Sequence, residues 1–315
     1  MTQLKIRTLE LKEYKQIEVL RQNEKPLPYL TDAFTHIWDL AYDIVPRAML
    51  AVEVGGELVG TAGYAMAEAD PELCFMGLII KPEYRRKGLG RQVYDMLIDK
   101  VRTRKARGVL TIVNTNQVAG LQFVAQLGFK EIGRTIYGQL DDVATVDMGA
   151  WDDPEKMVAS QNLRFTTLNH FPRQGLAERL LPIWSRTRPD QPQHWPYVPF
   201  SARRFQREIL ESEAIAWQHS FVLVTGENRI VGLNLNIHEA ENRLFTFYTG
   251  VDPDFRRQKL GTALKLKLIA HAQAQGIAVL AAENEASNVA MWRINKRLGF
   301  RRLLEWVVYQ KTLGA

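Results

Sequence analysis

Cysteine is nearly absent from this 315-residue chain, which contains Cys74 alone. A single cysteine excludes an internal disulfide framework and fits a reducing compartment. The sequence also lacks any run of about 18 apolar residues, and residues 1–21 mix charged with apolar side chains, so neither a membrane span nor a signal peptide is indicated. We therefore expect a cytoplasmic protein with no membrane partner.

Signals for metal ions and nucleic acids are missing as well. The six histidines are scattered without the spacing of a ligand set, so we expect no metal site. The net charge is +6 and the pI is near 9.3, but the sequence has no clustered basic helix with interleaved aromatic residues. The charge fits local phosphate-binding groups on a basic surface better than it fits a nucleic-acid partner.

An internal repeat organises the chain. Pro82-Glu83-Tyr84-Arg85-Arg86 resembles Pro253-Asp254-Phe255-Arg256-Arg257, and Leu127-Gly128-Phe129 resembles Leu298-Gly299-Phe300. Both pairs are 171 residues apart, so the stretch that joins them has one length in both halves. A first strand and a hairpin with a glycine-containing turn also recur in the same order. Together these matches indicate a duplication.

Each half has the pattern of an α/β domain. We expect a first strand, one or two helices, a hairpin, a long apolar strand (73–80 and 244–251), a helix, a short apolar strand (109–113 and 277–281), another helix and a final hairpin. Gly108 and Gly276 are expected to close the central helices. The predicted fold is two tandem α/β domains, 1–150 and 163–315, each a mixed twisted sheet flanked by helices, with a linker over 151–162.

The most informative segment follows the long strand of the first half. Gly88 and Gly90 have no β-carbon, so their backbone N–H groups can approach an anion closely, and they open a helix whose dipole favours negative charge. Arg85, Arg86, Lys87 and Arg91 add positive charge. The segment is suited to a diphosphate, although a basic turn that merely begins a helix would look similar.

Two common phosphate sites do not fit this context. No Lys-Ser or Lys-Thr pair follows the glycines, as in a P-loop, and the segment follows the fourth strand rather than the first, unlike a Rossmann site. With the later Leu-Gly-Phe segments, the arrangement resembles the GCN5-related N-acetyltransferase (GNAT) family, and the repeat resembles its tandem members, such as the mycothiol synthase-like group.

The resemblance implies acetyl-CoA as cofactor, bound between the fourth and fifth strands of the first half. Its pyrophosphate would meet the N–H groups at the helix start, its pantetheine would pair with the strand end like an added strand, and one asparagine would contact its arm. That asparagine is alternatively an N-cap for the next helix. The residues implied are Leu78, Ile79, Ile80, Arg85, Arg86, Lys87, Gly88, Leu89, Gly90, Arg91 and Asn116.

The second half departs from the pattern at the corresponding turn. Lys259 occupies the position of Gly88 in the first half. Its β-carbon and long side chain therefore intrude where the backbone would contact the phosphate. Either Lys259 holds a phosphate itself, or the site is degenerate and kept for structure. The later helix of this half matches the family better than that of the first. The cofactor-binding residues implied here are Val251, Arg256, Gly261, Thr262 and Asn288.

The catalytic groups are less clearly marked. The family often places a tyrosine four residues before the later glycine, where this chain has Val124 and Asn295. Water, Tyr137 or Tyr309 could protonate the thiolate instead, with Tyr137 as our candidate, and Glu72 is our candidate to deprotonate the attacking amine, directly or through water. As alternatives, the tyrosines are half-buried strand residues and Glu72 is a solvated strand end. Cys74 is expected to be a packed small residue.

The resemblance implies transfer of an acetyl group to an amine of a small molecule or peptide, mainly at the first half. Two alternatives stay open: the second half is catalytic while the first holds acetyl-CoA unproductively, or the protein is a CoA-binding scaffold without catalysis. The irregular segment 186–200 is either a plain long loop or a lid over the acceptor. The chain is expected to be a monomer or a homodimer.

Overall fold

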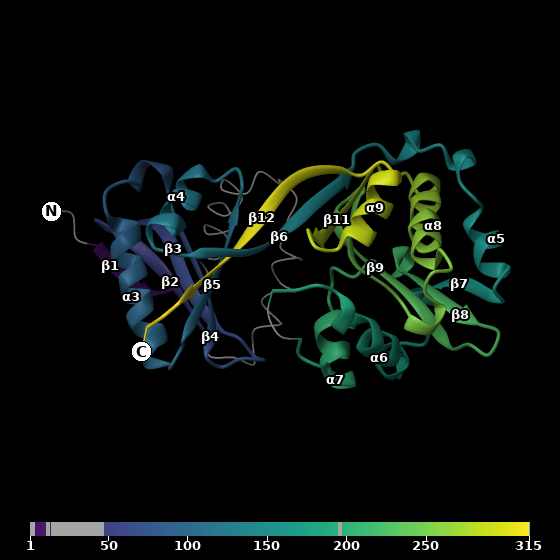
Figure 1. Ribbon diagram of the computed structural model, residues 1–315, viewed down its shortest axis with the longest axis horizontal. Helices are drawn as coiled ribbons and strands as arrows, with labels where there is room; N and C mark the ends of the chain where they lie inside the picture. The colour runs from purple at the N-terminus through teal and green to yellow at the C-terminus, as the bar shows by residue number, and fades with distance from the viewer. Residues whose placement is uncertain (1–3, 11–12, 14–46, 195–196, 315) are drawn as a thin grey trace.

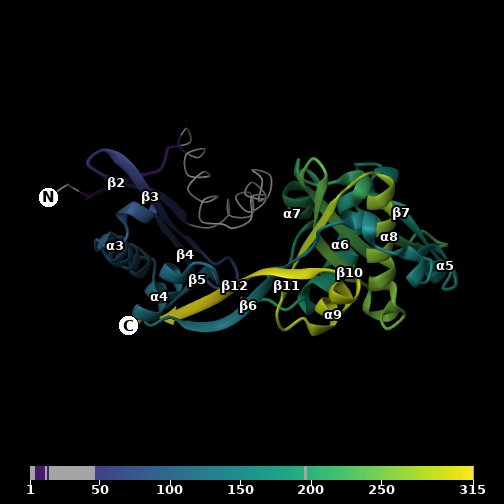
Figure 2. The same ribbon diagram turned by 90° about the horizontal axis from the view of Figure 1, so that it is seen from above.

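A computed structural model describes residues 4–10, 13, 47–194 and 197–314. The helices predicted between the first strand and the first hairpin fall on residues outside these ranges, as does Trp195. Two lobes lie end to end, with two long strands running between them (Figures 1 and 2). No helix in the described part of the chain has both the length and the apolar character needed to cross a membrane.

The first lobe is built from the elements of the first half, the last of which, β6, runs on into the second lobe. The described strands and helices are β1 (Leu4–Thr8), β2 (Arg47–Val54), β3 (Glu57–Met66), β4 (Leu73–Ile80), α3 (Leu89–Thr103), β5 (Gly108–Asn114), α4 (Val118–Gln126) and β6 (Lys130–Leu140). Helix α3 buries one apolar face, which includes Val93, Leu97 and Val101, against the sheet. This is the face that its 3.6-residue periodicity predicts.

The second lobe repeats this order. It comprises α5 (Pro154–Ala159), β7 (Leu163–Thr167), α6 (Leu176–Thr187), α7 (Ala202–Phe205), β8 (Phe221–Thr225), β9 (Ile230–Ala240), β10 (Arg243–Val251), α8 (Leu260–Ala274), β11 (Val279–Glu285), α9 (Val289–Arg297) and β12 (Arg301–Thr312). Apolar clusters cover both faces of its sheet, one beneath α6 and the other beneath α8.

The described strands form one mixed sheet in the order β1-β2-β3-β4-β5-β12-β6-β11-β10-β9-β8-β7. The last strand of each half is exchanged: β12 pairs with β5 of the first half, and β6 pairs with β11 of the second. β6 and β12 also pair with each other. The predicted mixed sheets flanked by helices are confirmed.

Two local predictions were wrong. Each half ends in one long strand rather than a hairpin, because β6 and β12 take their partners from the other half. Gly108 does not close α3: it begins β5, and Lys105 takes the left-handed conformation after the helix, with φ 64°. Gly276 does follow α8 in that conformation, with φ 69°. The predicted linker contains α5, which packs against α8.

Candidate acyl-CoA site

Strands β4 and β5 separate from each other along their length. They pair in parallel only from Leu73–Phe75 to Gly108–Leu110, although β4 continues to Ile80 and β5 to Asn114. The other edge of β4 pairs with β3 along its whole length up to Ile80. The edge of β4 that faces β5 therefore offers backbone donors and acceptors, beyond Phe75, to an extended chain entering the split.

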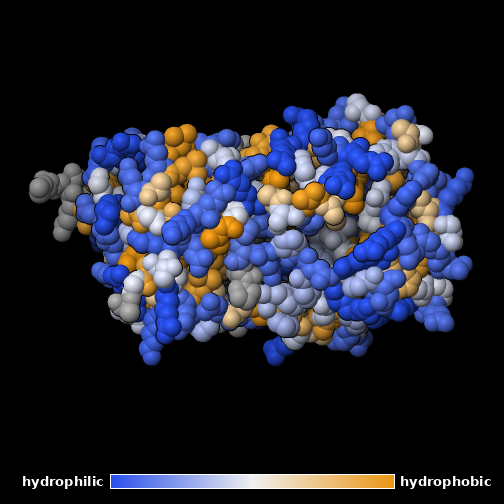
Figure 3. Space-filling view, viewed as in Figure 1, coloured by the Kyte–Doolittle hydropathy of each residue, from blue (hydrophilic) through white to orange (hydrophobic). Residues whose placement is uncertain are grey.

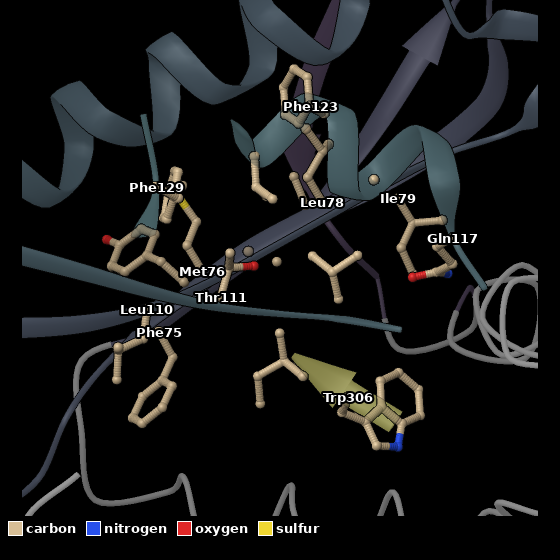
Figure 4. A pocket seen from close by; sticks show the side chains of 18 of the residues that line it. Phe75, Met76, Leu78, Ile79, Leu110, Thr111, Gln117, Phe123, Phe129 and Trp306 are labelled. Carbon is tan, nitrogen blue, oxygen red and sulfur yellow. The ribbon is translucent and has the colours of Figure 1, made fainter. Parts of the chain in front are cut away.

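A cavity of about 1300 Å³ occupies this split and continues into the second lobe. Figure 4 shows Phe123 on the side of the helices and Phe75 and Trp306 on the opposite side. Among the predicted cofactor residues, the cavity is lined by Leu78, Ile79, Ile80, Arg85, Arg86, Gly88, Gly90, Arg91 and Asn116. Lys87 and Leu89 do not line it: the Lys87 ammonium lies 5.2 Å from the centre of the Tyr84 ring.

The start of α3 has the geometry of an anion cradle. Arg86 and Gly88 both have positive φ, 60° and 79°. The Nε group of Arg85 donates to the Ile80 carbonyl at 2.7 Å, which ties the turn to the end of β4. The first N–H groups of the helix have no partner within it. Gly88, Gly90 and Arg91 at this helix start line the cavity, as do Arg85 and Arg86.

Asn116 precedes α4, whose N-cap is Gln117. Its backbone N–H donates to the Asn114 side-chain oxygen at 2.8 Å, and its side chain lines the cavity. The structure therefore places Asn116 beside the cavity rather than at the cap position. In the second half Asn288 is the N-cap of α9, where it accepts a hydrogen bond from the Met291 N–H at 3.2 Å.

The corresponding turn of the second half has the same backbone conformation. Arg257 and Lys259 have φ of 63° and 59°, and the Nε group of Arg256 donates to the Val251 carbonyl at 3.0 Å. Two of the positive charges in this turn, however, already have partners. Arg256 pairs with Asp190 at 2.7 Å, and the Lys259 ammonium lies 3.8 Å from Asp152.

The cavity does not extend to this second turn, and none of the residues predicted to bind cofactor in the second half lines it: Val251, Arg256, Gly261, Thr262 and Asn288.

A tyrosine occupies the split of the second half. β10 and β11 also separate, beyond Thr246 and Ala282. The hydroxyl of Tyr248 lies 2.5 Å from Thr187 Oγ1, and its ring lies 4.6 Å from that of Trp184. A β-carbon on Gly250 would come within 2.8 Å of the Tyr248 hydroxyl, so the ring covers this glycine. At the position that matches Tyr248, the first half has Gly77, which is exposed and has no side chain.

The two predicted catalytic residues do not line the cavity. Glu72 precedes β4, at the end where β4 and β5 are still paired, and is exposed in an ion pair with Arg107 at 3.2 Å. Tyr137 is fully buried in the second lobe. Its hydroxyl lies 3.1 Å from Glu239 and accepts from Arg243 at 2.8 Å. Burial and the Glu239 carboxylate raise the pKa of Tyr137 well above its ordinary value.

Other side chains that the sequence did not point to lie in the cavity wall. Tyr94, on α3, lines the cavity and accepts a hydrogen bond from the Lys311 ammonium at 3.0 Å. Glu283 and Glu285, on β11, line its far part. Burial raises the pKa of Glu285, which forms an ion pair with His194 of the segment 186–200. No spacing rule indicates Glu283 and Glu285, because it is the exchanged strands β12 and β6 that join β11 to the sheet of the first half.

Three of the histidines predicted to be scattered are neighbours in the fold. His219 Nδ1 lies 2.9 Å from His271 Nε2, and the rings of His219 and His238 are 5.3 Å apart. Burial lowers the pKa of His219 to about 4. Within the described ranges no group of three or more His, Cys, Asp or Glu side chains is arranged to hold a metal ion.

The sequence matches the Acetyltransferase (GNAT) family twice, over residues 14–129 and 173–300. The chain belongs to this family. A search of curated proteins gave no match. Among solved structures, a tandem GNAT protein from the clavulanic acid biosynthesis pathway, solved without AcCoA, is 16% identical, with a TM-score of 0.74 and 99% of both chains covered.

Two further solved structures share the fold. A GCN5-related N-acetyltransferase from Sphaerobacter thermophilus is 16% identical, with a TM-score of 0.67, and covers 99% of this chain and 97% of its own. A GNAT-family acetyltransferase from Colwellia psychrerythraea is 13% identical, with a TM-score of 0.63, and covers 98% of this chain and 100% of its own. The chain thus has two GNAT domains in tandem.

Proposed function

We propose that this protein is an N-acyltransferase that binds acetyl-CoA in the first half and transfers the acetyl group to an amine. One observation carries the proposal: the cavity joins the split between β4 and β5 to the cradle at Gly88, whereas it does not reach the cradle at Lys259. The pyrophosphate would lie on the N–H groups at the start of α3, beside Arg86. The pantetheine would run along the free edge of β4.

The chemistry is attack of a neutral amine on the thioester carbonyl. A backbone N–H in the free edge of β4, between Leu78 and Ile80, would stabilise the developing oxyanion. The carbonyl carbon gains the C–N bond, the C–S bond breaks, and CoA leaves as a thiolate. The cofactor supplies the activated acyl group, and the protein holds the amine and the thioester together.

The cavity wall favours different proton-transfer groups from Glu72 and Tyr137. Tyr94 lines the cavity near the split and can protonate the thiolate, with Lys311 beside its hydroxyl. Glu283 and Glu285 are carboxylates of the described chain that line the cavity. Strands β12 and β6 lie between β11 and β5, so a proton from the amine would reach Glu285 through water.

Paired substitutions at the two cradles test the proposal. Gly88→Glu places a carboxylate where the pyrophosphate would lie, and Lys259→Glu is the matched change in the second half. We expect Gly88→Glu to abolish acetyl-CoA binding in calorimetry and Lys259→Glu to leave it unchanged. Retained affinity in Gly88→Glu, with an unchanged melting temperature, would exclude cofactor binding at the first half.

Catalysis is tested separately from binding. Release of free CoA thiol is followed with a panel of small amines, amine-bearing antibiotics and peptides. We expect steady release with at least one acceptor, and a reduction of about 10²–10⁴-fold in Tyr94→Phe if that hydroxyl donates the proton. Acetyl-CoA binding without thiol release from any acceptor would support the alternative of a CoA-binding scaffold.

A further inference from the structure

The far part of the cavity, in the second lobe, contains buried hydrogen-bond donors without partners. We propose that Arg188, Trp184 and Tyr197 form a subsite for an oxyanion, such as a carboxylate, at the far end of the acceptor. This inference rests on the proposed function, because it takes the acceptor to enter the same cavity as acetyl-CoA. It assigns the second half a role in acceptor recognition.

Two of these donors belong to residues that line the cavity, and Tyr197 lies close enough to act electrostatically on Arg188. Arg188 and Trp184 both line the cavity, and the guanidinium lies 6.0 Å from the centre of the indole ring. Trp184 is 2% exposed, and its Nε1 group has no hydrogen-bond partner. The Arg188 Nη1 atom and the Tyr197 hydroxyl are also buried and unpaired. Leaving such groups unpaired costs free energy, which a ligand oxygen would recover.

The guanidinium lacks a counter-ion in the described chain. Burial lowers the pKa of Arg188, and the titratable groups that act on it are the hydroxyls of Tyr248 and Tyr197, not a carboxylate. By contrast, nearby Arg186 pairs with Asp252 and Asp254, at 3.2 and 2.9 Å. A desolvated guanidinium beside two further donors is the arrangement that binds a carboxylate or phosphate in a charge-assisted way.

Tyr248 covers the split of the second half next to this pocket, so the pocket is not needed there for a cofactor. The matching position in the first half, Gly77, is open. The volume agrees with two ligands: about 1300 Å³ exceeds the range of roughly 300–1,000 Å³ that is usual for one small ligand. The part beyond the split is thus available to an acceptor.

The sheet order sets the length of that acceptor. From β4 to β10 there are five strand spacings in the order β4-β5-β12-β6-β11-β10. At about 4.8 Å each, they give at most about 24 Å along the sheet. An extended peptide of about five to seven residues covers this span. Aromatic side chains line the way, among them Phe75, Trp306 and Phe247. We infer an elongated amine with an oxyanion at its other end.

Peptides of three, five and seven alanine-rich residues, each as free acid and as C-terminal amide, serve as probes. Binding is measured by calorimetry with and without acetyl-CoA. We expect the wild-type protein to bind the five- or seven-residue acid about 10–100 times more tightly than its amide, because the acid adds charge-assisted hydrogen bonds. Arg188→Gln is expected to remove this preference, and the control Arg186→Gln to retain it.

Trp184→Phe keeps an aromatic side chain, although a smaller one, and removes the N–H, so it is expected to reduce the preference less than Arg188→Gln does. Equal binding of acid and amide by the wild type, absence of binding by both, or a preference that persists in Arg188→Gln would overturn the subsite. A failure of the proposed function looks different: acetyl-CoA itself would not bind to the wild-type protein. Inorganic phosphate that competes with the acid but not with the amide would support the subsite and identify the oxyanion as the recognised group.

Discussion

Thr135 on β6 and Trp306 on β12 lie directly opposite each other in the sheet, and they are 171 residues apart, which is the offset of the repeat. Each is therefore the counterpart of the other. The registers of the exchanged strands agree: Val109 pairs with Lys311, and their counterparts Leu280 and Leu140 pair as well. The two halves are thus related by a local two-fold axis that passes between Thr135 and Trp306.

This symmetry predicts the behaviour of the first half alone. Residues 1–150 would lack β12, which pairs with both β5 and β6, and would leave these edges open. In a second copy, β6 can take the place of β12, so we expect a strand-exchanged homodimer. Light scattering after size exclusion measures the mass. A stable, folded monomer would show that the exchange is not needed by the first half.

The second prediction concerns the two cradles. Lys259 holds the left-handed conformation of Gly88 at a cost of roughly 1 kcal/mol, which Lys259→Gly relieves while adding freedom to the unfolded chain. We expect a stability change below about 1 kcal/mol and still one acetyl-CoA per chain in calorimetry, because Arg256 stays paired with Asp190. Two binding sites, or a rise in turnover, would instead favour a catalytic second half.

Much of this fold is visible in the sequence because it is local. The positive φ at Gly88, the proline-started turn before it and the apolar face of α3 each depend on residues close together in the chain. The repeat then shows where the second copy lies. The predicted domain boundaries at 150 and 163 stay a prediction, since one sheet runs through both halves.

What the sequence did not indicate depends on partners far along the chain. The prediction of a final hairpin in each half was wrong because β6 and β12 pair with each other although they are about one repeat apart in the sequence. The same exchange places Trp306 beside β5 and joins β11, with Glu285, to the sheet of the first half. Arg188 falls in a proline-rich segment, and its unpaired donor appears only when its neighbours are placed. Contacts between residues this far apart in the chain leave no regular spacing in the sequence.

Cys74 gives a third prediction, that its thiol does not react in the native protein. Its side chain is fully buried in β4, and burial raises its pKa to about 12. We expect no alkylation by iodoacetamide at pH 8, and one adduct after denaturation, as measured by intact mass. Rapid labelling of the folded protein would contradict this placement. Cys74→Ser is expected to remain active, because the thiol touches no part of the cavity.

The last prediction concerns Lys265, the counterpart of Tyr94 in α8. Its side chain is buried, with the ammonium 5.4 Å from the centre of the Phe300 ring, and burial lowers its pKa to about 8. Between pH 8 and about 10.5 the unfolded chain holds a proton that the folded protein has lost, so stability rises with pH across this window. The gain is at most about 3 kcal/mol, and below pH 8 this slope disappears.

Lys265→Met removes the buried ammonium and keeps most of the side-chain volume. At pH 7 we expect this variant to be more stable than the wild type by about 1–3 kcal/mol, and the difference to shrink as the pH approaches 10.5. Urea unfolding at pH 7, 8.5 and 10 measures the difference, with the exposed Lys100→Met as control. If the Lys265→Met and wild-type stabilities changed in parallel with pH, the ammonium would have to be solvated in the folded protein, contrary to its place among the buried residues of α8.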